Sequence, residues 1–196
     1  MREIEFRAYL EDSLLSARID LPDGIRLTDF LNESEEISLI GAELKALDDG
    51  RVVNAGDVTI PVIDILLVEA FDDYGGRDRR IRTRSSQVEM VIGPYRVDGY
   101  VHGPTAGDPV ESLSRRSAML PVTSAKVAFW LAGELEVRER AVAIVNRLLA
   151  DVGTPEPHGP SVLEKFGLSP VDPRAKDLTR ELLVNPPGEK DPESAP

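Results

Sequence analysis

Five arginines within eight residues are the strongest candidate for chemistry in this sequence. They are Arg77, Arg79, Arg80, Arg82 and Arg84. A guanidinium group binds phosphate or carboxylate oxygens in a bidentate manner, so the cluster predicts a site for a nucleotide, another anionic small molecule or an acidic protein surface. The competing interpretation is structural: a solvated linker or strand whose arginines face the acidic N-terminal part of the chain. We favour the structural or self-association interpretation.

Other residue types give little support for catalysis. The chain has no cysteine, which excludes thiol nucleophiles, iron–sulfur clusters and zinc–thiolate sites. His102 and His158 each lack a second ligand at metal-binding spacing, and we expect His102 to be a half-exposed strand residue. Asp29, Glu43 and Asp64 could form a carboxylate acid/base pair only if the fold brought them together. We therefore expect a non-enzymatic protein with no catalytic residues, no metal site and no cofactor.

Charge limits the class of partner. The formal net charge is −12, which argues against general nucleic-acid binding, because that requires a cationic surface. Residues 1–71 contain 16 acids and 6 bases, a net charge of −10, whereas 72–152 contain 11 and 12, a net charge of +1. The first residues do not resemble a signal peptide, and the longest apolar stretch, 60–70, is too short to span a bilayer. We expect a cytoplasmic protein without a transmembrane segment.

Alternating apolar residues predict β-strands in the first 70 residues. In the first strand, 4–10, even-numbered side chains form the apolar face, and Arg7 and Tyr9 lie on the opposite face. A second strand covers 15–21 and ends at a Pro-Asp-Gly turn. A helical turn or loop at 26–32 follows, with Leu27, Phe30 and Leu31 inward. Further strands are predicted over 36–47 and 58–70, and Pro61 places the last of these at a sheet edge or a bulge.

The chain resembles itself at a shift of about 82 positions. Val97–Ser114 lies over Leu15–Asn32 without a gap, and Gly41–Leu44 lies over Ser124–Val127 at a shift of 83. What matches is the succession of a strand, a Pro-containing turn, a short polar segment and another strand. This pattern predicts two tandem copies of one small β unit.

The segment 135–152 is ambiguous between strand and helix. Its apolar residues fit a helical period, yet those from Leu135 to Val145 also alternate. A shift of 77 places it over the strand predicted at 58–70. We expect a strand through Asn146, then a turn. The alternative is a C-terminal helix in an α+β second copy.

The last 44 residues, 153–196, have a different composition. They contain nine of the fifteen prolines, beside charged and small residues, which is typical of a disordered tail. Two segments within it could form short helices that dock on the β units or on a partner. Their apolar residues are Leu163, Phe166, Leu178 and Leu182.

The sequence therefore predicts an all-β protein of two small barrels or bent sheets, each of about SH3-like or Sm-like size. The first covers 1–71, a Gly/Arg-rich linker covers 72–87, and the second covers 88–152, before the tail. The leading functional hypothesis is an interaction or scaffold protein that self-associates or binds a protein partner. The alternative is a regulatory sensor of an anionic small molecule at the arginine cluster.

Overall fold

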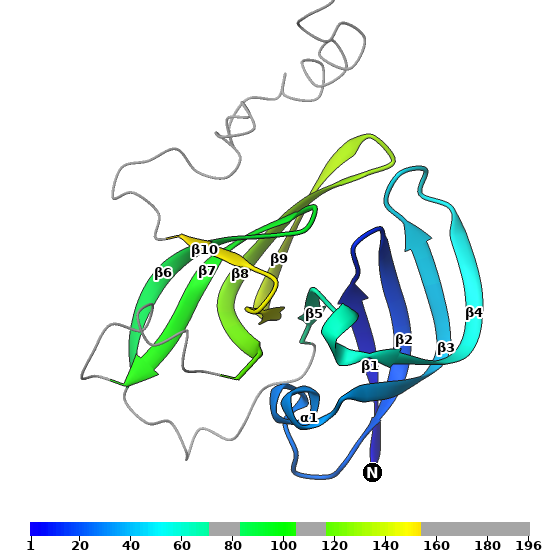
Figure 1. Ribbon diagram of the computed structural model, residues 1–196, viewed down its shortest axis with the longest axis horizontal. Helices are drawn as coiled ribbons and strands as arrows, with labels where there is room; N and C mark the ends of the chain where they lie inside the picture. The colour runs from blue at the N-terminus through cyan, green and yellow to red at the C-terminus, as the bar shows by residue number, and fades with distance from the viewer. Residues whose placement is uncertain (71–82, 105–116, 154–196) are drawn as a thin grey trace, which may run out of the picture. The chain divides into compact units, whose positions relative to one another are not determined.

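The computed structural model describes residues 1–70, 83–104 and 117–153, which form ten β-strands, one α-helix and one 3-10 turn (Figure 1). Five strands belong to the N-terminal half: β1 (Arg2–Tyr9), β2 (Ser13–Leu21), β3 (Glu36–Ala46), β4 (Val52–Pro61) and β5 (Leu67–Glu69). Five belong to the C-terminal half: β6 (Thr83–Ile92), β7 (Tyr95–Pro104), β8 (Met119–Leu131), β9 (Glu134–Asn146) and β10 (Asp151–Gly153). Helix α1 (Leu27–Glu33) lies between β2 and β3, and η1 (Val62–Asp64) precedes β5.

All ten strands belong to one antiparallel sheet in the order β10-β6-β7-β8-β9-β5-β1-β2-β3-β4. The mostly-β prediction is confirmed. Two separate barrels are not confirmed, because β5 pairs with β1 on one side and with β9 on the other and so joins both halves in one sheet. The predicted linker, 72–87, is described only from Thr83, where β6 begins. Its last five residues therefore belong to β6, and the rest of it lies outside the described residues.

The ambiguous segment after residue 133 is a strand. β9 pairs with β8 along its whole length, from Glu134 opposite Leu131 to Asn146 opposite Met119. Ala132 and Gly133 connect the two strands with φ angles of 51° and 79°, as a two-residue hairpin with a right-handed strand twist requires. The strand prediction through Asn146 is confirmed and the helical alternative is wrong, because cross-strand pairing overrides the helix-forming composition.

The strand predicted over 58–70 is wrong in its bounds. β4 begins at Val52 and ends at Pro61, η1 interrupts the strand, and β5 starts again at Leu67 on the other side of the N-terminal half. This break lets the chain leave β3 and pair with β1. β4 is the last strand of the sheet, so the prediction that Pro61 marks an edge is confirmed.

Two hydrophobic clusters fill the described part of the molecule, and each contains side chains from both halves. The cluster formed mainly by β6–β9 also includes Tyr9, Leu14, Leu66 and Leu67, from the N-terminal half. The cluster formed mainly by β1–β3 and α1 includes Met119 and Ile144, from the C-terminal half. Each half thus completes the core of the other.

Matching irregularities bend the middle strands of the two halves. The ladder between β2 and β3 shifts register between Ser16 and Arg18, and that between β7 and β8 shifts between Asp98 and Tyr100. Gly41 and Ser124 have left-handed φ angles of 63° and 49°. Beyond Gly41 on β3 and beyond Ser124 on β8, side chains still alternate between inward and outward, but the pattern is offset by one residue.

Helix α1 connects the halves through a side chain. Leu27 and Leu31 are buried, as predicted, and Phe30 is half-buried. The amide of Asn32 accepts a hydrogen bond from the backbone N of Met119 (2.8 Å) and donates one to the carbonyl of the same residue (2.9 Å). Asn32 therefore occupies the place of a further strand beside β8. This helix is too short to cross a membrane, and no other α-helix occurs among the described residues.

Candidate functional site

Most of the arginine cluster lies outside the described residues. The structure describes only Arg84, which is exposed on β6 opposite Gly103. The tail residues predicted to dock, Leu163, Phe166, Leu178 and Leu182, also lie outside the described residues. Both remain predictions.

The residues considered for catalysis lie at separate places. Asp29 is exposed on α1, Glu43 on β3 and Asp64 on η1. The described residues contain no group of three or more histidine, aspartate or glutamate side chains that could hold a metal. His102 is exposed within β7, where its Nε2 lies 2.7 Å from the hydroxyl of Thr123.

The structure instead gathers charged residues around Glu69, the last residue of β5. Its side chain is fully buried between β1 and β9. Arg138 Nη1 lies 3.5 Å from Glu69 Oε1, and Arg140 Nε lies 2.9 Å from Oε2. Arg7 Nη1 lies 3.8 Å from Oε2, and the hydroxyl of Tyr9 donates a hydrogen bond to Oε1. The N-terminal half thus supplies the carboxylate, and the C-terminal half supplies two of its three guanidinium partners.

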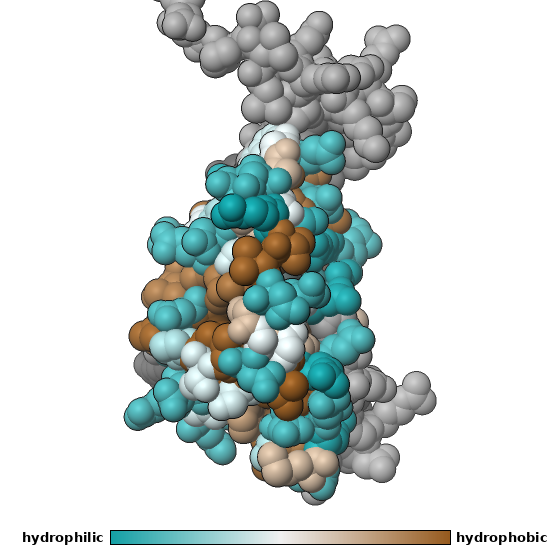
Figure 2. Space-filling view, turned by 90° about the vertical axis from the view of Figure 1, so that its right-hand side faces the viewer, coloured by the Kyte–Doolittle hydropathy of each residue, from teal (hydrophilic) through white to brown (hydrophobic). Residues whose placement is uncertain are grey.

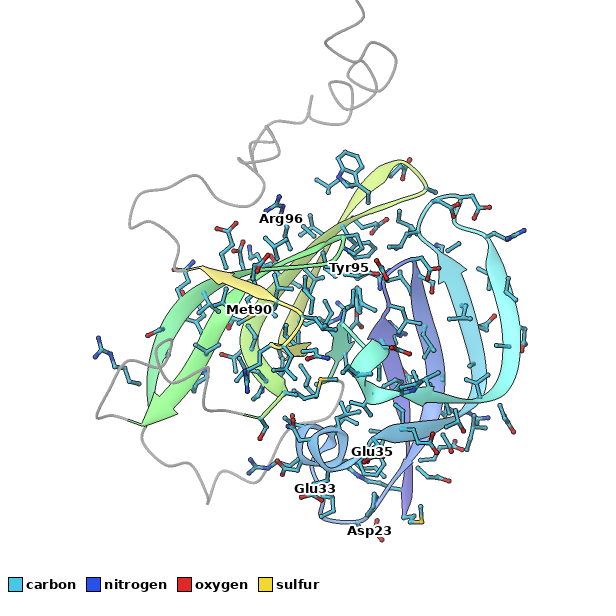
Figure 3. The ribbon with its side chains drawn as sticks, in the orientation of Figure 1. Asp23, Glu33, Glu35, Met90, Tyr95 and Arg96 are labelled. Carbon is cyan, nitrogen blue, oxygen red and sulfur yellow. The ribbon has the colours of Figure 1, made fainter. Side chains whose placement is uncertain are left out.

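Aromatic rings form the apolar side of this cluster. Tyr9, Tyr95 and Phe129 meet edge to face, with centroids 5.2–5.5 Å apart. The guanidinium of Arg138 lies over Phe129, 5.1 Å from its ring centroid. Tyr95, the first residue of β7 (Figure 3), donates a hydrogen bond from its hydroxyl to the carbonyl of Leu10 (2.7 Å). The rings therefore pack the β1–β2 turn against the C-terminal half.

Their surroundings shift the pKa values of Glu69 and Tyr9 in opposite directions. Burial alone would raise the pKa of Glu69, but the close contact with Arg140, the hydrogen bond from Tyr9 and the charges of Arg140 and Arg138 outweigh it and lower that pKa. Burial, together with the hydrogen bond to Glu69, raises the pKa of Tyr9. Glu69 is therefore ionised and Tyr9 neutral at pH 7.

A carboxylate that is both ionised and inaccessible to solvent cannot act as a general acid on a substrate. It can hold neighbouring strands in one register, because the arginines lose their counter-charge if the strands separate. The chemistry of this cluster is thus structural: it fixes the junction of β1, β5 and β9.

Sequence reasoning missed this cluster. The alternation of β1 placed Tyr9 on the polar face, but Tyr9 is buried because β5 and the C-terminal half cover that end of the strand. Glu69 interrupted an apolar run, and that was a usable signal: an acid within a buried strand must have a partner. Two of its partners, Arg138 and Arg140, lie about seventy residues later in the chain, on β9.

The surfaces most open to a partner are the two ends of the sheet. β4 ends the N-terminal half and β10 ends the C-terminal half, and neither has a strand on its outer side within the described residues. Val52 and Val53 are about half exposed on β4 (54% and 49%), and Val152 is 37% exposed on β10. Figure 1 draws β4 at the right, and the side shown in Figure 2 carries hydrophobic patches between hydrophilic side chains.

Backbone hydrogen bonds identify the outward groups on β4. Val62 N donates to Glu35 O (2.9 Å). At this end of β4, the backbone N–H and C=O groups of even-numbered residues therefore point toward β3. The N–H and C=O groups of Thr59 therefore point outward, away from β3. Unpaired edge groups of this kind are a template for another strand.

Comparison of the chain with models of protein families, with curated proteins and with solved structures found no match.

Proposed function

We propose that this chain is a non-enzymatic interaction protein, built from two copies of one small β unit, that binds protein partners by strand addition at β4 and β10. The observation that carries the proposal is the pair of sheet edges with outward backbone groups and exposed valines. The charged cluster around Glu69, by contrast, is satisfied within the chain.

Strand order supports the duplication. The N-terminal half runs β5-β1-β2-β3-β4 and the C-terminal half β10-β6-β7-β8-β9, so the last strand of each half lies beside its first. The register shifts at 16/18 and 98/100 are 82 residues apart, and the left-handed residues Gly41 and Ser124 are 83 apart. These spacings equal the two shifts at which the sequence resembles itself.

Strand pairing also corrects the end of the alignment. Glu36 lies opposite Pro61 in the first half, and Met119 lies opposite Asn146 in the second. Since Met119 is 83 residues after Glu36 and Asn146 is 85 after Pro61, β9 corresponds to β4 at a shift of 85. The shift of 77 expected from the sequence was wrong. A pattern with a period of two matches equally well after any even displacement, so alternation alone cannot choose between shifts of 77 and 85.

Substitutions at the edges test the proposal. Thr59→Pro removes an outward N–H from β4, and Val152→Lys adds a charge to β10; both changes oppose strand addition. In affinity purification with cross-linking mass spectrometry from the protein's own cells, wild-type protein should give cross-links to partner chains that map to β4 or β10. Each edge variant should lose those that map to its own edge.

Ser16→Lys is the matched control, because Ser16 is exposed on β2, an interior strand. It should leave the cross-linked complexes unchanged. Complexes that persist equally in Thr59→Pro, Val152→Lys and Ser16→Lys would overturn the edge-binding proposal.

A further inference from the structure

We propose that the partner is a second copy of this chain, joined head to tail, with β10 of one molecule antiparallel to β4 of the next and Val152 opposite Thr59. This inference rests on the proposed function, because it uses the same edges and the same duplication. It adds the identity of the partner, the polarity of the contact and its register.

The chain already contains one contact of this type. β5 closes the N-terminal half and pairs with β9, the outer strand of the C-terminal half, with Val68 opposite Ile144. Asn146 N donates to Leu66 O (2.8 Å), and Ala70 N donates to Val142 O (3.3 Å). The backbone groups of even-numbered residues in and beside β5 therefore form the hydrogen bonds with β9. This joint holds the two halves of one molecule in a single sheet.

Both sides of that contact recur at the ends of the sheet, where no strand among the described residues pairs with them. Arg7 lies opposite Glu69, and its counterpart Glu89 lies opposite Gly153, so β10 corresponds to β5 at a shift of 84. β4 corresponds to β9 at a shift of 85. Val152 thus stands where Val68 stands, and Thr59 where Ile144 stands. The two ends of the described sheet thus correspond to the two sides of the contact that β5 and β9 form within the molecule.

Compared with the internal contact of β5 and β9, the open edges β10 and β4 have lost charged side chains on both sides. Gly153 replaces Glu69, while Val53 and Gly56 take the paired positions of Arg138 and Arg140. The carboxylate and both guanidinium groups of the internal joint are thus absent together from the open edges. Had only one side changed, pairing would bury an uncompensated charge, which is strongly unfavourable. With both sides changed, pairing leaves neither a carboxylate nor a guanidinium of that cluster without its counter-charge.

Burial also differs between the joint and the open edges. Leu67, Val68 and Glu69 are fully buried, whereas all three residues of β10 are exposed. On the other side, Ala143 and Val145 are buried in β9, and their counterparts Val58 and Ile60 in β4 are half-buried. A strand added to each edge accounts for the difference.

The contact between molecules should be weaker than the internal one. Pro61 stands where Asn146 stands and has no N–H to donate, so the bond equivalent to Asn146 N to Leu66 O is lost. Asp151 replaces the buried Leu67, and the ion pair has no equivalent. We expect reversible, concentration-dependent association. Since β10 meets β4 and not another β10, the contact is heterologous. Repeated contacts of this kind form a ring where the rotation closes and an open filament where it does not.

Single cysteines test both polarity and register, because the chain has none of its own. Thr59→Cys and Val152→Cys are prepared separately from the full chain, mixed at concentrations that span the range of association, and oxidised. Opposite residues that share hydrogen bonds in an antiparallel pair have Cα atoms about 5.5 Å apart, within the range for a disulfide. We expect a covalent heterodimer in the mixture and monomers when either variant is oxidised alone.

Val52→Cys is the matched control: it lies exposed on the same strand, seven residues from Thr59, and should not cross-link to Val152→Cys. Wild-type sedimentation velocity should show a rise in mean sedimentation coefficient with concentration that Thr59→Pro abolishes. Disulfide dimers of one variant alone would overturn the head-to-tail polarity, and equal cross-linking through Val52→Cys would overturn the register. A wild-type monomer at all concentrations would overturn self-association, yet partner cross-links lost in Thr59→Pro or Val152→Lys would still support the proposed function.

Discussion

At the residue scale, Glu69 decides how firmly the two halves are joined. Its carboxylate is fully buried, but it has three guanidinium neighbours and a tyrosine hydroxyl, so the cost of desolvation is offset locally. Arg140 Nε and Glu69 Oε2 are in ion-pair contact without the geometry of a hydrogen bond. The pair therefore relies on charge, which makes it sensitive to neutralisation.

Glu69→Gln keeps the shape of the side chain and removes its charge. We expect a loss of about 3 kcal/mol in the free energy of unfolding at pH 7, at the lower end of the range for breaking a buried ion pair. The low value follows because Arg138 and Arg140 remain 25% and 28% exposed and can regain water. Urea denaturation measures the change, and Glu43→Gln, an exposed site on β3, should shift it little.

The pH dependence of that difference separates charge from packing. The folded state lowers the pKa of Glu69, so its ionisation stabilises the fold above the unfolded value of about 4.3, and this contribution is lost as the pH falls through the folded pKa. Glu69→Gln lacks the titrating group. The two proteins should therefore approach equal stability as the pH is lowered from 5 toward 3. A constant difference over that range would assign the effect to packing instead.

At the element scale, the bend between β7 and β8 depends on glycine. The ladder shifts register between Asp98 and Tyr100, which brings the backbone of β8 close to Gly99. A Cβ at Gly99 would contact the side chain of Val122 and lie 2.9 Å from the carbonyl oxygen of Thr123. A backbone atom cannot move aside as a flexible side chain can, so the bend excludes larger residues.

Gly99→Ala should lower the free energy of unfolding by about 1–3 kcal/mol, the usual cost of overpacking. The matched control is Gly153→Ala, where an added Cβ would meet only Glu89 O, at 3.8 Å. Thermal denaturation should show a lower midpoint for the first variant and little change for the second. Equal midpoints for both would mean that β8 can shift to make room.

At the scale of the whole molecule, the halves depend on each other. Each hydrophobic cluster contains residues of the other half, and Asn32 binds the backbone of Met119 across the boundary. Acidic residues near α1, including Asp23, Glu33 and Glu35 (Figure 3), contribute to the negative charge of the N-terminal half. We therefore expect the two halves to unfold in one transition.

Asn32→Ala tests this coupling, because the only tryptophan, Trp130, lies in the other half, on β8. Removal of the amide leaves the N–H and C=O of Met119 without this partner, at a cost of about 1–3 kcal/mol. Tryptophan fluorescence and far-UV circular dichroism should shift to the same lower denaturation midpoint. Ser34→Ala, which removes a bond only to Phe30 O, should shift both less. Separate transitions for the two signals would contradict coupled unfolding.

Alternation along the chain determined most of the strands and the all-β class, because these depend on neighbours only two residues apart. Proline has no N–H to donate, and this alone predicted an edge position or a bulge at Pro61. The resemblance of the chain to itself also indicated the strand at 134–146, although the shift used for it was wrong. Local patterns carry this information because a strand must present one face to a core. The helix-forming composition of 134–146 did not outweigh this requirement.

Tertiary structure alone decided which strands join the halves and which residues meet there. The pairing of β5 with β9, the burial of Tyr9 and the contacts of Glu69 with Arg138 and Arg140 link positions about 60 to 130 residues apart. Nothing in the local sequence sets those distances. They follow from the phase changes at Gly41 and Ser124 and from the break at η1, which turn the strands until the two halves share one sheet.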